Sequence, residues 1–179
     1  MIKLKVLFIL LAVLILTGCS NTKIETTNTL TEVEQTQTQP TIVELETING
    51  EYRAVWNENY EYDKPLKIEN HSEWVDFFNE HPESGMEDNF KKEFTKEFFE
   101  DNVLYAYVKS EPSGSILLLT KSVRLQNDIL TLYMERIVPE VGTEDMATRI
   151  CIFGISREKI KNVRTVNVLI SEGIQSSSK

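Results

Sequence analysis

Cysteine is scarce in this sequence of 179 residues, which contains only Cys19 and Cys151. Because a disulfide within the chain needs both, any modification of Cys19 would leave Cys151 unpaired and exclude an internal disulfide. Cys151 lies in the apolar segment TRICIFGI, where a buried and unreactive thiol is the usual outcome. We therefore expect packing alone to stabilise the fold.

Histidine and glycine are also rare, with two and seven copies, respectively. Ser113 and Ser115 flank Gly114 without a G-x-S-x-G nucleophile turn, and both histidines, His71 and His81, lie far upstream. Two histidines and one thiol do not form a zinc-ligand set, and no glycine-rich loop opens a helix to bind phosphate. The sequence predicts a protein without metal or cofactor that is not an enzyme; catalysis by carboxylates alone is the remaining enzymatic alternative.

Basic residues are outnumbered by acidic ones. The chain has 19 Lys and Arg residues against 28 Asp and Glu, and removal of Lys3 and Lys5 with an N-terminal signal leaves 17, a formal net charge of −11. Such a surface repels phosphate backbones and anionic lipid headgroups, which argues against a nucleic-acid-binding protein. A basic partner would be attracted, although an acidic composition most often serves solubility.

A hydrophobic run stands at the N-terminus, where Lys3 and Lys5 precede the apolar segment 6–16. This order predicts a secretory signal, because the run is too short for a membrane-spanning helix of about 20 residues. The residues LTGC at positions 16–19 resemble the lipobox of bacterial lipoproteins. The resemblance implies cleavage before Cys19, diacylglycerol on its thiol and acylation of the new N-terminus. Several acyl chains give a stable anchor, which a single chain does not.

The sequence is thus predicted to have three parts. Residues 1–18 form a lipoprotein signal peptide, whose removal leaves the protein lipid-anchored at the extracytoplasmic face of the cell membrane. Residues 19–47 carry the lipidated Cys19 and a disordered polar tether, which cannot bury enough apolar surface to fold. A first strand is expected to begin near Ile42, and residues 48–179 form a single α+β domain. An ordinary cleaved signal with a chance cysteine is the alternative.

Two short helices are expected at the start of the domain. Trp74, Phe77 and Phe78 recur at helical spacing, with Asn70 as the cap and His81-Pro82 as the end. A second helix is predicted by aromatic residues that recur every four positions: Phe90, Phe94 and Phe98. Both series are typical of a core stripe rather than of a ligand-binding surface.

From residue 102 the pattern changes to that of strands. The predicted segments are 102–109, 115–125, 129–138, 147–155 and 164–170. Short connections favour antiparallel neighbours, a helical turn capped by Ser156 precedes the last strand, and the tail is expected to be frayed. We therefore predict an α+β fold, in which two short N-terminal helices are followed by an antiparallel sheet of at least five strands.

Two loops of the predicted sheet carry the candidate partner-binding residues. Ser113, Gly114 and Ser115 form a turn in which the glycine is expected to take a positive φ while the hydroxyls bond the backbone. In the loop PEVGTEDMA, Thr143 and Asp145 are placed to bond backbone donors. Such hydrogen bonds commonly serve only the backbone donors of the loop itself. If both loops lie at related ends of the sheet, however, they form a surface presented on a rigid scaffold.

Segment 97–170 resembles a known family, and eleven residues carry the match: Phe98, Phe99, Leu104, Ser113, Gly114, Ser115, Pro139, Thr143, Asp145, Met146 and Ala147. The segment resembles small Firmicutes lipoproteins and, more distantly, the C-terminal domain family of protease complex subunit PrcB. The turn reads SGSI at 113–116, where that family commonly has TGGY. The resemblance implies a non-catalytic domain that associates with other cell-envelope proteins.

Together these features predict a membrane-anchored lipoprotein whose domain binds or scaffolds an envelope protein without catalysis. The alternative is a protease inhibitor, or a protease-complex accessory subunit, that presents its loops to an envelope protease. Chagasin-like inhibitors show a similar layout, with loops at one end of a β-sandwich.

Overall fold

The computed structural model describes residues 41–84 and 93–174. These described residues belong to one compact unit. The predicted signal peptide 1–18, Cys19 and most of the predicted tether lie outside the described residues. Within the part of the chain that is described, no helix combines the length and the apolar character needed to cross a membrane.

Eight strands and three helices make up the described part of the fold. In chain order they are β1 (Ile42–Leu45), β2 (Ile48–Ala54), β3 (Pro65–Ile68), α1 (His71–Glu80), α3 (Phe98–Asp101), β4 (Asn102–Glu111), β5 (Leu117–Gln126), β6 (Ile129–Val138), β7 (Ala147–Ser156), α4 (Arg157–Ile160) and β8 (Thr165–Ile174). Sheet A has the strand order β1-β5-β6-β8, and sheet B has the order β2-β7-β4-β3. Neighbouring strands are antiparallel except β6 and β8, which are parallel.

The α+β class holds broadly, but the arrangement predicted within it is wrong in two respects. Three strands precede α1, so the helices do not come first. The later strands do not form one antiparallel sheet of five, because β4 and β7 belong to sheet B whereas β5, β6 and β8 belong to sheet A. The connection 139–146 carries the chain from sheet A to sheet B, and the segment around α4 carries it back. This double crossing leaves β8 parallel to β6.

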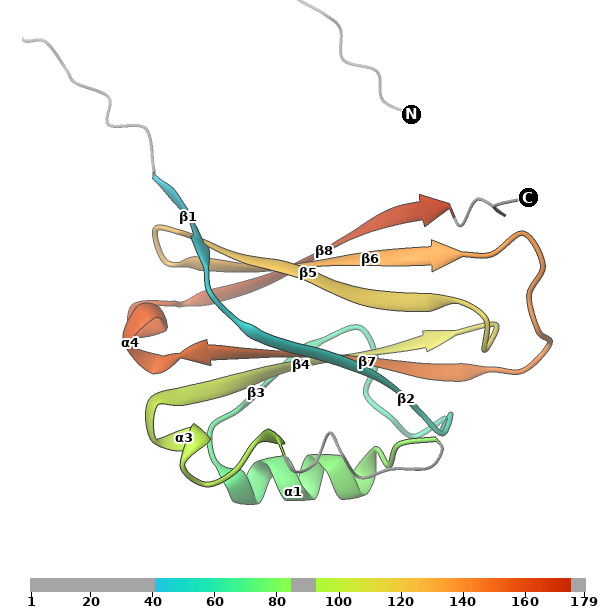
Figure 1. The fold of residues 1–179 in the computed structure, drawn as a ribbon, viewed down its shortest axis with the longest axis horizontal. Coiled ribbons are helices and arrows are strands. Elements are labelled where there is room, and N and C mark those ends of the chain that lie inside the picture. Colours follow the sequence, from blue (N-terminus) through green and yellow to red (C-terminus); the bar gives the residue numbers. More distant parts are fainter. Residues whose placement is uncertain (1–40, 85–92, 175–179) are drawn as a thin grey trace, which may run out of the picture. The chain divides into compact units, whose positions relative to one another are not determined.

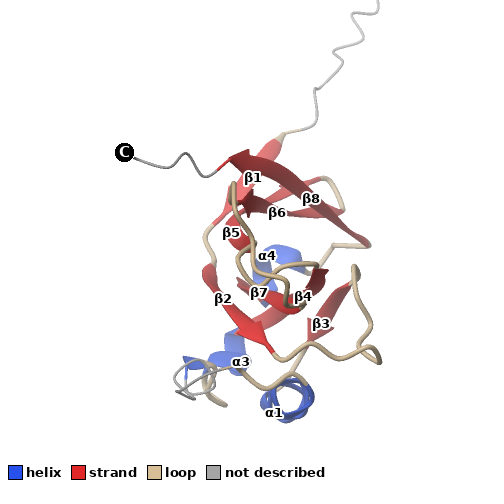
Figure 2. Ribbon diagram, turned by 90° about the vertical axis from the view of Figure 1, so that its right-hand side faces the viewer, coloured by secondary structure: helices blue, strands red, loops and turns tan. Residues whose placement is uncertain are grey.

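Sheet B lies between two hydrophobic cores, with sheet A on one side and α1 on the other (Figures 1 and 2). Along β4, Val103 and Tyr105 pack toward sheet A, whereas Leu104 and Ala106 pack toward the helical layer. A sheet covered on both faces requires strands that are apolar throughout, which explains the sequence of β4. Cys151 of β7 is buried in the core between the sheets, as predicted, and this burial raises the pKa of its thiol.

Helix α1 agrees with its prediction. Asn70 Oδ1 accepts a hydrogen bond from the Glu73 N–H at 3.0 Å, and the Glu73 carboxylate accepts one from the Glu69 N–H at 2.7 Å. The first bond satisfies a donor that the first helical turn leaves free, and the second ties the residue before the cap to the helix. The helix ends before His81, and its apolar face consists of three buried side chains: Trp74, Phe77 and Phe78.

The other local predictions are met in part. The strand expected near Ile42 is present as β1. Of the predicted second helix, the described residues 94–97 are not helical and 98–101 form the single turn α3. Phe94 is fully buried, and Phe90 lies outside the described residues. The Ser156 side chain makes no capping hydrogen bond to α4. Strand β8 continues to Ile174, so the first part of the tail is not frayed.

The two ends of the sheets carry different parts of the chain (Figure 1). At one end, which we call the tether end, Ile42 of β1 lies opposite Gln126 at the end of β5, and the chain enters the domain there. At the other end, which we call the loop end, Leu117 begins β5 beside the loops 112–116 and 139–146. Strand β5 has 10 residues. Since an extended strand rises by about 3.3 Å per residue, the two ends lie about 30 Å apart.

Candidate functional site

The two loops of the loop end are joined by hydroxyl hydrogen bonds. The Thr143 N–H donates to Ser113 Oγ at 2.9 Å and to Ser115 Oγ at 3.2 Å. The Thr143 hydroxyl oxygen lies 3.2 Å from each of these two serine oxygens. The structure therefore brings together residues that are distant in the sequence, and their hydroxyl groups bond one another.

Asp145 connects the same loops to the neighbouring strand. Its Oδ1 atom accepts a hydrogen bond from the Gly114 N–H at 3.3 Å, and its Oδ2 atom lies 2.5 Å from Nη2 of Arg53 in β2. The carboxylate thus ties the glycine turn to sheet B. The resulting network contains all five candidate residues: Ser113, Gly114, Ser115, Thr143 and Asp145.

The lack of a side chain at Gly114 leaves room for close contacts and does not serve an unusual backbone angle. Its φ lies outside the left-handed region, so the positive φ predicted for this turn is wrong. A Cβ atom at this position would lie 2.5 Å from Asp145 Oδ2 and 2.9 Å from the Arg53 guanidinium nitrogens. A Cβ atom on Gly142 would likewise lie 2.9 Å from Ser113 Oγ. Both glycines let polar side chains approach the backbone closely.

Two arginines hold the glycine turn from the strands of the domain. Arg149 of β7 donates to Gly114 O at 2.6 Å and to Ile116 O at 2.8 Å. Arg136 of β6 donates to the carboxylate of Glu111, the last residue of β4, over distances of 2.8 to 3.0 Å. The Glu111 side chain is only 1% exposed. The turn is therefore fixed by a buried ion pair at its base and by Arg149 at its carbonyl groups.

The loop end combines this polar network with exposed apolar side chains. Val141 is 83% exposed and Met146 is 48% exposed, while Val55 and Trp56 follow β2 at the same end of sheet B and are also exposed. None of the hydrogen bonds of the two serines in the described chain involves a histidine, since the serine hydroxyls bond to Thr143. The arrangement offers a braced surface for contact and supplies no imidazole base to a serine nucleophile.

The Asp145 carboxyl is strongly biased toward its charged form. The pKa of Asp145 is lowered from 3.8 to about 2; hydrogen bonding from Thr143 is the largest cause, Arg53 is the next, and backbone N–H groups add to the effect. Because the folded pKa lies below the ordinary one, ionised Asp145 stabilises the loop end fully above about pH 4. This contribution is lost as the pH falls through the folded pKa of about 2.

Replacing Thr143 with valine is expected to raise the pKa of Asp145 toward its ordinary value, because valine keeps the shape of threonine but has no hydroxyl to donate. An NMR titration of the side-chain carboxyl measures this pKa. Thr165→Val, at the tether end, is the matched control and should leave the pKa of Asp145 at about 2. An unchanged value in Thr143→Val would show that the hydroxyl does not hold the carboxylate.

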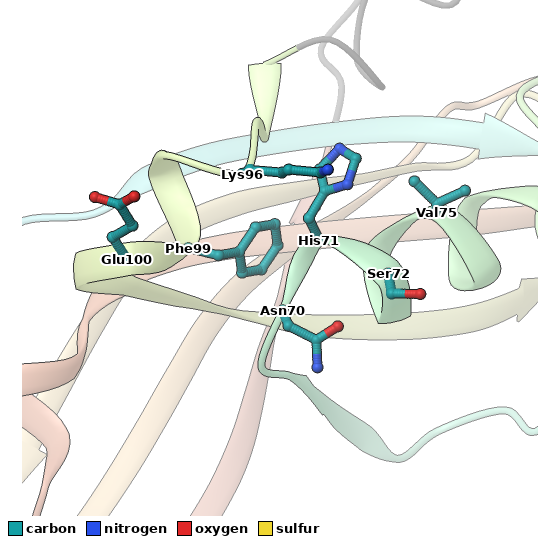
Figure 3. Close-up of a pocket in the computed structure, with 7 residues that line it drawn as sticks. All are labelled: Asn70, His71, Ser72, Val75, Lys96, Phe99 and Glu100. Atoms are coloured by element: carbon teal, nitrogen blue, oxygen red, sulfur yellow. The ribbon is translucent and has the colours of Figure 1, made fainter.

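A separate hollow lies between α1 and α3 (Figure 3). It has a volume of about 560 Å³ and is lined by Asn70, His71, Ser72, Val75, Lys96, Phe99 and Glu100. The His71 and Phe99 rings meet edge to face, with their centroids 6.4 Å apart, and the Glu100 carboxylate points away from the other lining side chains. Glu100 is the one carboxylate of this lining. The hollow therefore does not provide the pair of carboxylates that acid–base catalysis without histidine would use.

Comparison with known proteins identifies no relative of this chain. No family model, no curated protein and no solved structure matches this chain. Within residues 41–84 and 93–174, no three His, Cys, Asp or Glu side chains lie close enough to hold a metal ion together.

The sequence did not indicate the charged residues that support the loops. Arg53, Arg149 and the pair Glu111–Arg136 hold the glycine turn but were not among the candidate residues. A signal was present, because Arg149 interrupts the otherwise apolar strand β7. A charge within such a strand has to find a polar partner, and here the partners are the carbonyl groups of the glycine turn.

Proposed function

We propose that this protein is a membrane-anchored, extracytoplasmic lipoprotein whose domain binds another envelope protein through the loop end, without catalysis. The observation that carries the proposal is the network around Thr143, which joins two sequence-distant loops and fixes them to both sheets. Three arginines from three strands support these loops: Arg53 of β2, Arg149 of β7 and Arg136 of β6. A rigid surface loses less conformational entropy on binding, which favours a recognition role.

The position of the loop end agrees with an anchored protein. The chain enters the domain at the tether end, and the loops lie at the opposite end of β5. If Cys19 is acylated as the LTGC motif predicts, the tether holds the first end toward the membrane. The loop end is then directed away from the bilayer, where another protein can reach it.

The second candidate function is inhibition of, or accessory binding to, an envelope protease. It is favoured by Val141, which is 83% exposed in a loop that is hydrogen-bonded to the rest of the domain at Thr143 and Asp145. A braced loop with one projecting side chain suits a protease cleft, because the loop resists the rearrangement that cleavage requires. The resemblance to the PrcB C-terminal domain family stays a prediction.

Crosslinking in living cells, followed by membrane isolation and mass spectrometry, tests the proposed function. The wild-type protein is expected in the membrane fraction with one or a few reproducible protein partners. Cys19→Ala should release the protein from the membrane, and Ser113→Ala combined with Thr143→Val should abolish partner capture while the protein stays anchored. Membrane attachment that survives Cys19→Ala, or capture that ignores the loop substitutions, would contradict the proposal. A protease as the sole partner would favour the second candidate.

A further inference from the structure

We infer that the partner of the loop end presents an apolar pocket with a basic rim, and that loop 139–146 inserts Val141 into this pocket. The inference rests on the proposed function and specifies the chemistry of the partner. It is based on the exposure, the charge and the bracing of this loop, which are independent observations on the described residues.

The apolar part of the inference comes from exposure. Val141 is the most exposed of the large hydrophobic side chains in the described chain, at 83%, and Met146 of the same loop is 48% exposed. Val138 precedes the loop and is 36% exposed. Single exposed apolar residues are common on protein surfaces, but a group on one braced loop marks an interaction surface.

The basic rim comes from the charge balance of the same loop. Glu140 and Glu144 flank Val141 on the chain, both are exposed, and neither forms an ion pair among the described residues. Asp145 is already neutralised by Arg53, and Arg136 is paired with Glu111. The charge left free on the loop is therefore negative, and a partner with Lys or Arg around its pocket complements it.

Bracing makes the loop suited to insertion. Thr143 and Asp145 fix the loop after Val141 through hydrogen bonds to Ser113, Ser115 and the Gly114 N–H. The projecting side chain is therefore presented in one arrangement before binding. Binding then costs less ordering of the loop, so a small apolar contact can still contribute a measurable affinity.

Selection of a random-peptide phage library on the mature acylated protein in detergent micelles tests the inference. Enriched peptides are expected to combine Lys or Arg with large apolar residues, and their binding should weaken as salt concentration rises. Val141→Ser should reduce the affinity of a selected peptide about tenfold, the effect of removing one buried aliphatic side chain. Ile129→Ser, a similar change from an exposed aliphatic side chain to serine at the tether end, should leave the affinity unchanged.

A double substitution tests whether the negative charge of loop 139–146 contributes to binding. Glu140→Gln combined with Glu144→Gln should reduce both the peptide affinity and its salt dependence. Glu46→Gln combined with Glu100→Gln should change neither, because these two exposed glutamates lie away from the loop end and form no ion pair among the described residues. Peptides without basic residues, binding that does not depend on salt, or binding that is insensitive to Val141→Ser would overturn the inference, as would a selection that yields no binder. These results test only the chemistry of the partner. Crosslinking in cells tests separately whether a partner exists, so a failure of the inference is distinguishable from a failure of the proposed function.

Discussion

Replacing Arg136 with methionine is expected to lower the free energy of unfolding by about 3 kcal/mol, because it leaves the buried Glu111 carboxylate without its partner. The Glu111 side chain is 1% exposed, and Arg136 contacts it through three hydrogen bonds while also lying 3.1 Å from Glu172. A charge buried in this way cannot regain water without opening the base of the glycine turn. Urea denaturation followed by circular dichroism measures the change.

The matched control for this prediction is Arg164→Met. The Arg164 side chain is 84% exposed and lies 3.8 Å from Asp128, and an exposed pair of this kind contributes about 0–1 kcal/mol. The double variant Glu111→Met with Arg136→Met should recover most of the lost stability, since no buried charge remains. If Arg136→Met is as mild as Arg164→Met, the ion pair does not support the loop end.

Replacing Trp74 with alanine is expected to cost about 3–5 kcal/mol, the usual range for deleting a buried aromatic side chain. Trp74 of α1 is fully buried, and its ring centroid lies 5.2 Å from that of Phe94 and 5.6 Å from that of Phe78. The side chain thus joins α1 to the segment before α3 in the core on the outer face of sheet B. Thermal and urea unfolding of the variant measure the loss.

The second tryptophan provides the control. Trp56 is 37% exposed, and its Nε1 atom donates to Ser110 Oγ at 3.2 Å. Trp56→Ala is expected to cost about 1 kcal/mol or less, as for most exposed positions. Similar losses in the two variants would mean that the helical layer is not packed on sheet B as the structure shows.

Local features of the fold could be predicted from the sequence because neighbouring residues determine them. Asn70 and Glu73 are three residues apart and cap α1 through their own side chains. The hairpin between β5 and β6 turns at Asn127, which takes a φ of 57°, a conformation that asparagine tolerates well. Hydrophobic periodicity likewise located the strands after residue 102, because it reports which residues face a core.

The topology could not be predicted in the same way, because periodicity does not state which core a strand faces. The sequence of β4 is apolar on both faces, which indicated a strand within a sheet but did not indicate that β7 is its neighbour. The parallel pair β6–β8 depends on the crossing of residues 139–146 between the sheets. Nothing in the local sequence distinguishes that connection from an antiparallel turn.

The candidate site likewise has a part that was predictable from local sequence and a part that was not. Ser113, Gly114 and Thr143 are typical turn residues, so they were predictable as loop positions. The association of these residues was only a hypothesis. The arginine that completes their network was not among the predicted site residues, because Arg53 and Asp145 are 92 residues apart in the sequence. Contacts over such a separation depend on the topology and cannot be derived from the residues on either side.

Site-specific photo-crosslinking in cells tests most directly whether the loop end is the working surface. A photo-reactive amino acid is placed at Val141 in one variant and at Ile129, at the tether end, in another, with Cys19 intact in both. The account predicts discrete protein adducts from position 141 and none from position 129. Adducts from position 129 alone, or equal adducts from both positions, would contradict it.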